Sequence, residues 1–174
     1  MAREPKILAF VQSMKFLADG LGATLIVEGV ETLSILDAMG NLSQDLVQGY
    51  AIARPMDAAA FLQFLRSDPT FPTPKLPISL LGAYAAHVLR RPLLYSLHAE
   101  MSDLSAVEFL ERSPLLQYLR LYPSLRTKPI LEAYGKLREL DQQSSQGVKQ
   151  RLQEIEENLQ PLVFAAIRAA DEES

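Results

Sequence analysis

The sequence predicts a short parallel α/β region followed by an all-helical region. Helix-like and strand-like apolar patterns alternate over the first third of the 174 residues, a proline-rich segment then interrupts the chain, and no strand pattern follows it. Alternating helix and strand signals with short connections are typical of a parallel sheet, either open or closed into a barrel. We therefore expect an α/β part at 1–67, a linker at 68–77 and a helical part at 78–174.

The α/β part is predicted to follow the order helix, strand, helix, strand, helix. Apolar residues recur at helical spacing over 7–17, 33–39 and 58–65, and Asp57 is placed to cap the last of these helices. The run at 23–27 is continuous, apolar and rich in β-branched residues, which is typical of a parallel strand covered on both faces. The second strand is expected at 46–50.

The helical part is expected to form an antiparallel bundle of four or five helices. Its helices are predicted over 78–90, 93–101, 105–121, 128–142 and 147–170. Ser105 and Glu108 form a capping-box pattern at the start of the third helix. In the last helix, apolar residues alternate spacings of four and three, which indicates a bundle seam or, if exposed, a dimerisation surface.

Composition restricts the classes of function. The chain has no cysteine and 2 histidines, so disulfides and thiolate metal sites are excluded, and a zinc site made by protein alone would need carboxylates. The formal net charge of −4 offers no basic field that would bind a nucleic-acid polymer. Charged residues interrupt the most apolar region, so we predict no membrane span and expect a cytoplasmic protein.

Polar residues follow both predicted strands. The first strand runs into EGVE at 28–31, and the second runs into QGY at 48–50. In parallel α/β folds, ligand chemistry is carried by residues at the carboxyl ends of the strands. A carboxylate directly after a buried strand is placed for general-base work, while Glu31 stands where the next helix begins and negative charge is favoured. From the residues alone, a surface carboxylate at a helix start explains Glu28 or Glu31 equally well.

Two motifs together resemble the end of EAL-type cyclic-di-GMP phosphodiesterase domains. VEGVET at 27–32 is similar to the motif that ends the seventh barrel strand in this family, and VQGYAIARPM at 47–56 is similar to the segment that ends the eighth. Val27 replaces the usual alanine, and Ala53 replaces a serine-like residue. The resemblance covers residues 5–65, and it implies that the α/β part is the C-terminal third of a TIM-like barrel.

The resemblance also implies roles for individual residues. Members of the family hydrolyse cyclic di-GMP to pGpG with two Mg²⁺ or Mn²⁺ ions that activate a water molecule. Glu28 matches the general base, and Glu31 matches the glutamate that supports the metal-site loop. Gln48 matches a glutamine of the substrate pocket, and Arg54 matches an arginine at the exit of the last strand, which we also assign to substrate binding.

The family's remaining metal ligands lie upstream of these motifs, and neither the Glu-Ala-Leu signature nor an Asp-Asp pair occurs in this sequence. We therefore expect the chain alone to bind no metal and to be inactive. It would be the C-terminal part of a longer phosphodiesterase and would pair with the upstream part of the barrel or with a second copy. Two alternatives stay open, a non-catalytic receptor for cyclic di-GMP and a module that contacts a protein partner.

The helical part has a fainter resemblance, to the chemoreceptor zinc-binding type of helical bundle. The likeness rests on His87 and on SPLLQYL at 113–119, but Ser113 stands where that family has a cysteine, and the later histidine is missing. It therefore implies shared architecture without zinc. We interpret His87 and His98 as ordinary core or surface residues, and the helical part as a regulatory or dimerisation module.

Overall fold

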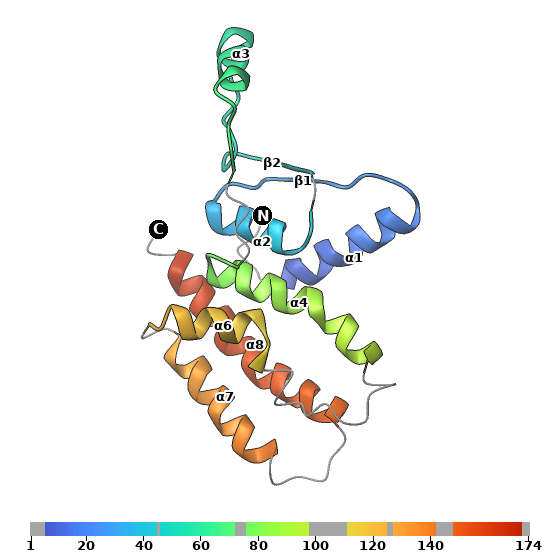
Figure 1. Cartoon of the computed structure of the whole chain (residues 1–174), viewed down its shortest axis with the longest axis vertical. Helices are drawn as coiled ribbons and strands as arrows, with labels where there is room; N and C mark the ends of the chain where they lie inside the picture. The colour runs from blue at the N-terminus through green and yellow to red at the C-terminus, as the bar shows by residue number, and fades with distance from the viewer. Residues whose placement is uncertain are drawn as a thin grey trace.

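The computed structural model describes residues 6–44, 46–71, 76–97, 111–124, 127–141 and 148–171. The first part contains α1 (Lys6–Gly20), β1 (Ile26–Glu28), α2 (Leu33–Asn41), β2 (Leu46–Gln48) and α3 (Ala58–Arg66) (Figure 1). The second part contains α4 (Leu80–Leu97), α6 (Pro114–Leu121), α7 (Lys128–Asp141) and α8 (Val148–Asp171). The predicted succession of an α/β part and a helical part is confirmed, whereas the TIM-like barrel stays a prediction.

The two strands form a parallel sheet in the described part of the chain, with Val27 opposite Val47. In the described part of the chain, β1 is covered on one face only. Val27 is buried in the core, whereas its neighbours Ile26 and Glu28 are exposed on the other face. The apolar run predicted cover on both faces, but no described element supplies the second layer.

Two predicted helix boundaries in the second part were wrong. Helix α4 continues through Pro92, where the prediction had separated two helices. An internal proline removes one backbone hydrogen bond, and the helix-forming leucines and arginines around it sustain the helix. Conversely, the helix predicted over 105–121 is interrupted at Ser113, whose extended backbone precedes Pro114 at the start of α6. The capping box at Ser105 and Glu108 lies outside the described residues.

A single cluster of buried apolar residues joins the two parts. It includes Leu8 of α1, Met39 of α2, Leu119 of α6 and Val163 of α8. Helix α4 lies between α1 and α2 on one side and α6 and α8 on the other (Figure 1), and it packs most extensively against α2. The helical part is therefore seated directly on the helix that follows β1.

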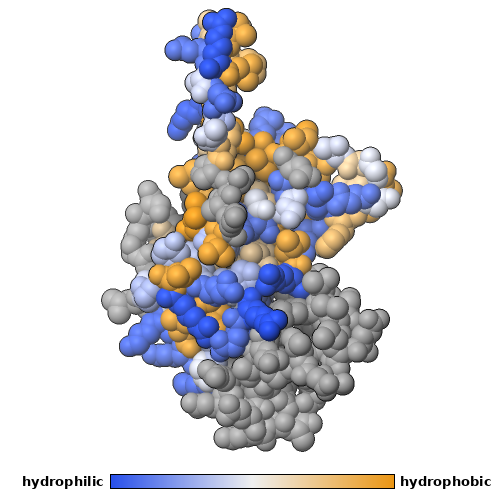
Figure 2. Space-filling model, viewed as in Figure 1, coloured by the Kyte–Doolittle hydropathy of each residue, from blue (hydrophilic) through white to orange (hydrophobic). Residues whose placement is uncertain are grey.

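Helix α3 stands away from this core at the end of an arm (Figure 1). None of its residues is buried, and Phe61, Leu62 and Leu65 expose an apolar face, which appears orange beside a blue polar face in Figure 2. The predicted cap is confirmed, because the Asp57 carboxylate accepts a hydrogen bond from the Ala60 N–H at 2.8 Å. Among the described helices, none is long and apolar enough to cross a membrane.

Candidate functional site

Glu28 and Gln48 lie side by side at the carboxyl ends of the two strands. They are register partners in the parallel pair, and neighbouring strands run about 4.8 Å apart. Both side chains are exposed. Since successive side chains alternate between the two faces of a sheet, both project from the face opposite Val27. The structure thus brings together the two residues that follow the predicted strands, in the arrangement that strand-end chemistry uses.

The face that carries Glu28 and Gln48 is apolar toward the other end of the strands. Ile26 and Leu46 share this face with them and are 56% and 45% exposed. Large aliphatic side chains on an uncovered sheet face contribute little to stability until another layer removes them from water. This face therefore combines a polar end with an apolar floor.

The loops after the two strands are tied to each other through Val30. The Val30 N–H donates to the Gln48 carbonyl at 3.1 Å, and the Val30 carbonyl accepts from the Ala51 N–H at 2.9 Å. Gly29 allows this turn with a φ of 75°, and any side chain at Gly49 would collide with the Val30 backbone. Val30 is fully buried, and its contacts with the end of β2 were not predicted from the sequence. The sequence feature that could have pointed to this buried position is an apolar residue between Glu28 and Glu31.

Glu31 lies one residue before the cap of α2. Thr32 is that cap, because its hydroxyl accepts a hydrogen bond from the Ile35 N–H at 3.3 Å. A carboxylate at this place interacts favourably with the positive end of the helix dipole. Glu31 is exposed and is separated from Glu28 by the buried Val30. Glu31 therefore lies next to the start of α2, and its assigned role stays a prediction.

Arg54 lies on the arm that leads to α3 and pairs with a residue of the QGY motif. Its guanidinium carbon is 5.0 Å from the centre of the Tyr50 ring, within the range of a cation–π contact. Both side chains are exposed. No described contact joins this pair to Glu28, so the structure groups the four predicted site residues as one strand-end pair and two separate positions.

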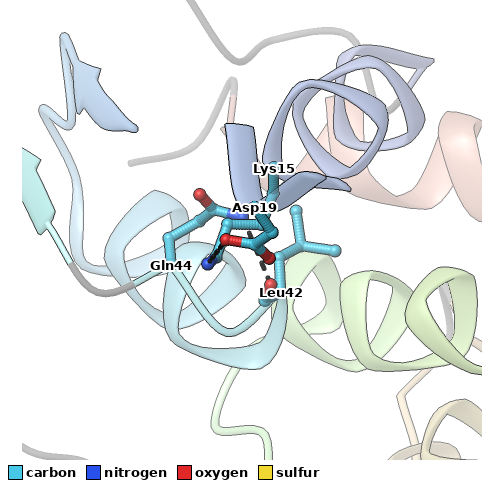
Figure 3. A network of polar contacts seen from close by, with 4 residues as sticks. All are labelled: Lys15, Asp19, Leu42 and Gln44. Atoms are coloured by element: carbon cyan, nitrogen blue, oxygen red, sulfur yellow. Dashed lines mark hydrogen bonds and ion pairs between the residues drawn. The ribbon is translucent and has the colours of Figure 1, made fainter. Parts of the chain in front are cut away.

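A second set of polar contacts lies near the other end of β2 (Figure 3). Lys15 and Asp19 form an ion pair at 2.6 Å on α1, and the buried Gln44 side chain donates to the Leu42 carbonyl at 3.2 Å. Within the described residues, the Gln44 side-chain oxygen has no hydrogen-bond partner. These contacts lie at the start of β2, whereas the strand-end loops lie after it.

The donor set for metal ions is incomplete in the described part of the chain. No three His, Cys, Asp or Glu side chains gather there as they would around a metal ion. The residues that faintly resemble a zinc-binding bundle do meet, because His87 Nδ1 lies 3.0 Å from the Ser113 hydroxyl oxygen. Both side chains are buried, so the hydroxyl gives the imidazole a neutral hydrogen-bond partner inside the protein. His98 lies outside the described residues.

Comparison with known proteins finds a relative for a segment of the chain. A segment of 64 residues is 38% identical to the cyclic di-GMP phosphodiesterase RocR of Pseudomonas aeruginosa. The match covers 37% of this chain and 16% of that relative, so the chain spans a small part of the relative's length. No protein-family profile matches the chain, and no solved structure matches it.

Proposed function

We propose that this chain supplies the strand-end part of a cyclic-di-GMP phosphodiesterase site, with Glu28 as the general base. The observation that carries the proposal is the register of the parallel pair, which sets Glu28 beside Gln48 at the carboxyl ends of both strands. The matched relative is a cyclic di-GMP phosphodiesterase. In this role the Glu28 carboxylate accepts a proton from the water that attacks the phosphodiester, and Gln48 and Arg54 contact the nucleotide.

The metal ions of the complete reaction need ligands beyond those described here. Mg²⁺ or Mn²⁺ would be held by several oxygen ligands, and the described part of this chain offers no such group. We therefore assign no step through a metal ion to these residues. We propose that this chain contributes the general base and the residues that contact the nucleotide, and that another segment contributes the metal ligands. Accordingly, the chain alone should not hydrolyse cyclic di-GMP.

The uncovered face of the sheet indicates that another segment packs against this site. Ile26 and Leu46 form an exposed apolar floor beside Glu28 and Gln48, and the sheet has unpaired edges in the described part. We propose that further strands of a barrel, on the same polypeptide or on a second copy, cover this face. Covering it would also exclude water around the carboxylate, which strengthens the electrostatic interactions of the site.

Two measurements distinguish the enzyme from the alternatives. The first is isothermal titration of cyclic di-GMP into a protein that combines residues 1–174 with the rest of the barrel. We expect saturable binding of the nucleotide. Formation of pGpG in the presence of Mg²⁺ then separates an enzyme from a receptor that only binds. A protein with neither binding nor product would contradict the proposal and would favour a module that contacts a protein partner.

A further inference from the structure

Asp37 lies in the middle of α2 and accepts hydrogen bonds from a distant segment. Its Oδ2 accepts from the backbone N–H groups of Ile78 and Ser79, at 3.2 and 2.9 Å, and from the Ser79 hydroxyl at 2.6 Å. Its Oδ1 accepts from the Asn41 side chain at 3.0 Å. Asp37 is 8% exposed. The buried carboxylate therefore satisfies backbone donors just before α4, which have no partner within that helix.

The first turn of α4 is shaped to fit this carboxylate. The Ser79 hydroxyl oxygen accepts from the Gly82 N–H at 2.9 Å, as a helix cap does. A side chain at position 82 would collide with the Asp37 carboxylate, so only glycine permits this approach. Leu81 and Ala83 on either side are buried in the same core as Met39. The contact thus depends on particular residues of both segments, Asp37 on α2 and Ser79 and Gly82 at the start of α4.

Helix α2 connects Asp37 directly to the strand-end loop. The helix begins after Thr32, whose carbonyl accepts from the Leu36 N–H at 3.0 Å, and Val30 just before it is hydrogen-bonded to the end of β2. We propose that Asp37 is a positioning residue. It anchors α2 to the first turn of α4, and α2 in turn holds the loop from Glu28 to Glu31 in place. The catalytic importance of that loop rests on the proposed function, whereas the structural connection from α4 to the loop does not.

Amide hydrogen exchange of the 174-residue chain tests the link. Asp37→Ala should speed exchange at least tenfold at two groups of amides, Gly82 and Ala83 on α4 and Val30 and Leu36 around the loop. Exchange in α7 should change much less, because that helix packs chiefly against α8. Ser79→Ala removes one hydrogen-bond donor to Asp37 and the cap of α4, so it should speed exchange at the same amides by a smaller factor. It serves as the test if Asp37→Ala prevents folding.

Asp57→Ala is the matched control, because Asp57 also caps a helix but bonds only within its own segment. It should speed exchange of the Ala60 amide and leave Val30 unchanged. The proposal is overturned if Asp37→Ala and Ser79→Ala expose the α4 amides while Val30 and Leu36 stay protected, or if exchange rises equally throughout the chain. No nucleotide is present in this experiment, so failure to bind cyclic di-GMP would remove the proposed function without deciding this result.

Discussion

Helices α2 and α3 begin alike and end in opposite environments. Each has 9 residues, each follows a strand of the same sheet, and each is capped by a side chain, Thr32 for α2 and Asp57 for α3. Helix α2 buries Asp37, Ala38 and Met39, whereas α3 buries none of its residues. The difference shows that local signals suffice to place a helix, while its contribution to stability depends on what covers it. Here α4 covers α2, and no described element covers α3.

The largest expected difference between the helices concerns their apolar side chains. Met39→Ala should lower the free energy of unfolding by about 2–5 kcal/mol, because it opens a cavity in the shared core. Leu62→Ala, on the exposed face of α3, should change it by less than about 0.5 kcal/mol. Urea unfolding followed by circular dichroism measures both. Equal losses would show that a partner, such as a second copy, covers α3 in solution.

A smaller difference is expected at the two caps. Thr32→Ala should lower the free energy of global unfolding by about 1 kcal/mol, because α2 unfolds together with the core. Asp57→Ala removes a better-formed hydrogen bond, but α3 can fray alone, so the unfolding midpoint should hardly move. Comparing the midpoints with the loss of helical signal before the transition tests this. A Thr32→Ala midpoint that matches the wild type would argue against α2 as part of the cooperative core.

The smallest effect concerns Tyr118 of α6. Burial raises the pKa of this hydroxyl above 10.0, and the neighbouring Tyr122 and the Asp37 carboxylate of α2 raise it further. Above about pH 10 the unfolded chain therefore releases this proton before the folded chain does, so stability should fall as the pH rises. In Tyr118→Phe this contribution is absent, and the decline of the unfolding free energy between about pH 9 and 11 should be shallower. An unchanged slope would count against the raised pKa.

The sequence predicted what depends on neighbouring residues. The five elements of the first part were placed within a few residues, since their apolar periods and the Asp57 cap are local features. Glu28 and Gln48, which end the two strands, are register partners in the structure, a pairing that the sequence motifs alone do not specify. Their chemical roles, and the roles of Glu31 and Arg54, stay predictions.

What the sequence did not predict depends on contacts between distant segments. Asp37 reads as one charged residue on an apolar helix, and nothing in its neighbourhood reveals donors that lie 41 and 42 residues away. The continuation of α4 through Pro92 was likewise not predicted, because a proline inside a helix removes one hydrogen bond and so commonly marks a boundary. The apolar run of β1 indicates that a covering layer is needed, but it does not show which segment supplies that layer.

The most direct test of the strand-end site is hydrolysis of cyclic di-GMP by the protein that combines residues 1–174 with the rest of the barrel. Glu28→Gln keeps the shape of the side chain but removes its capacity to accept a proton, so pGpG formation should fall by about 10²-fold or more while nucleotide binding is retained. Glu132→Gln, an exposed carboxylate on α7, should leave both unchanged. Turnover by Glu28→Gln at the wild-type rate would contradict the assignment of Glu28 as the base.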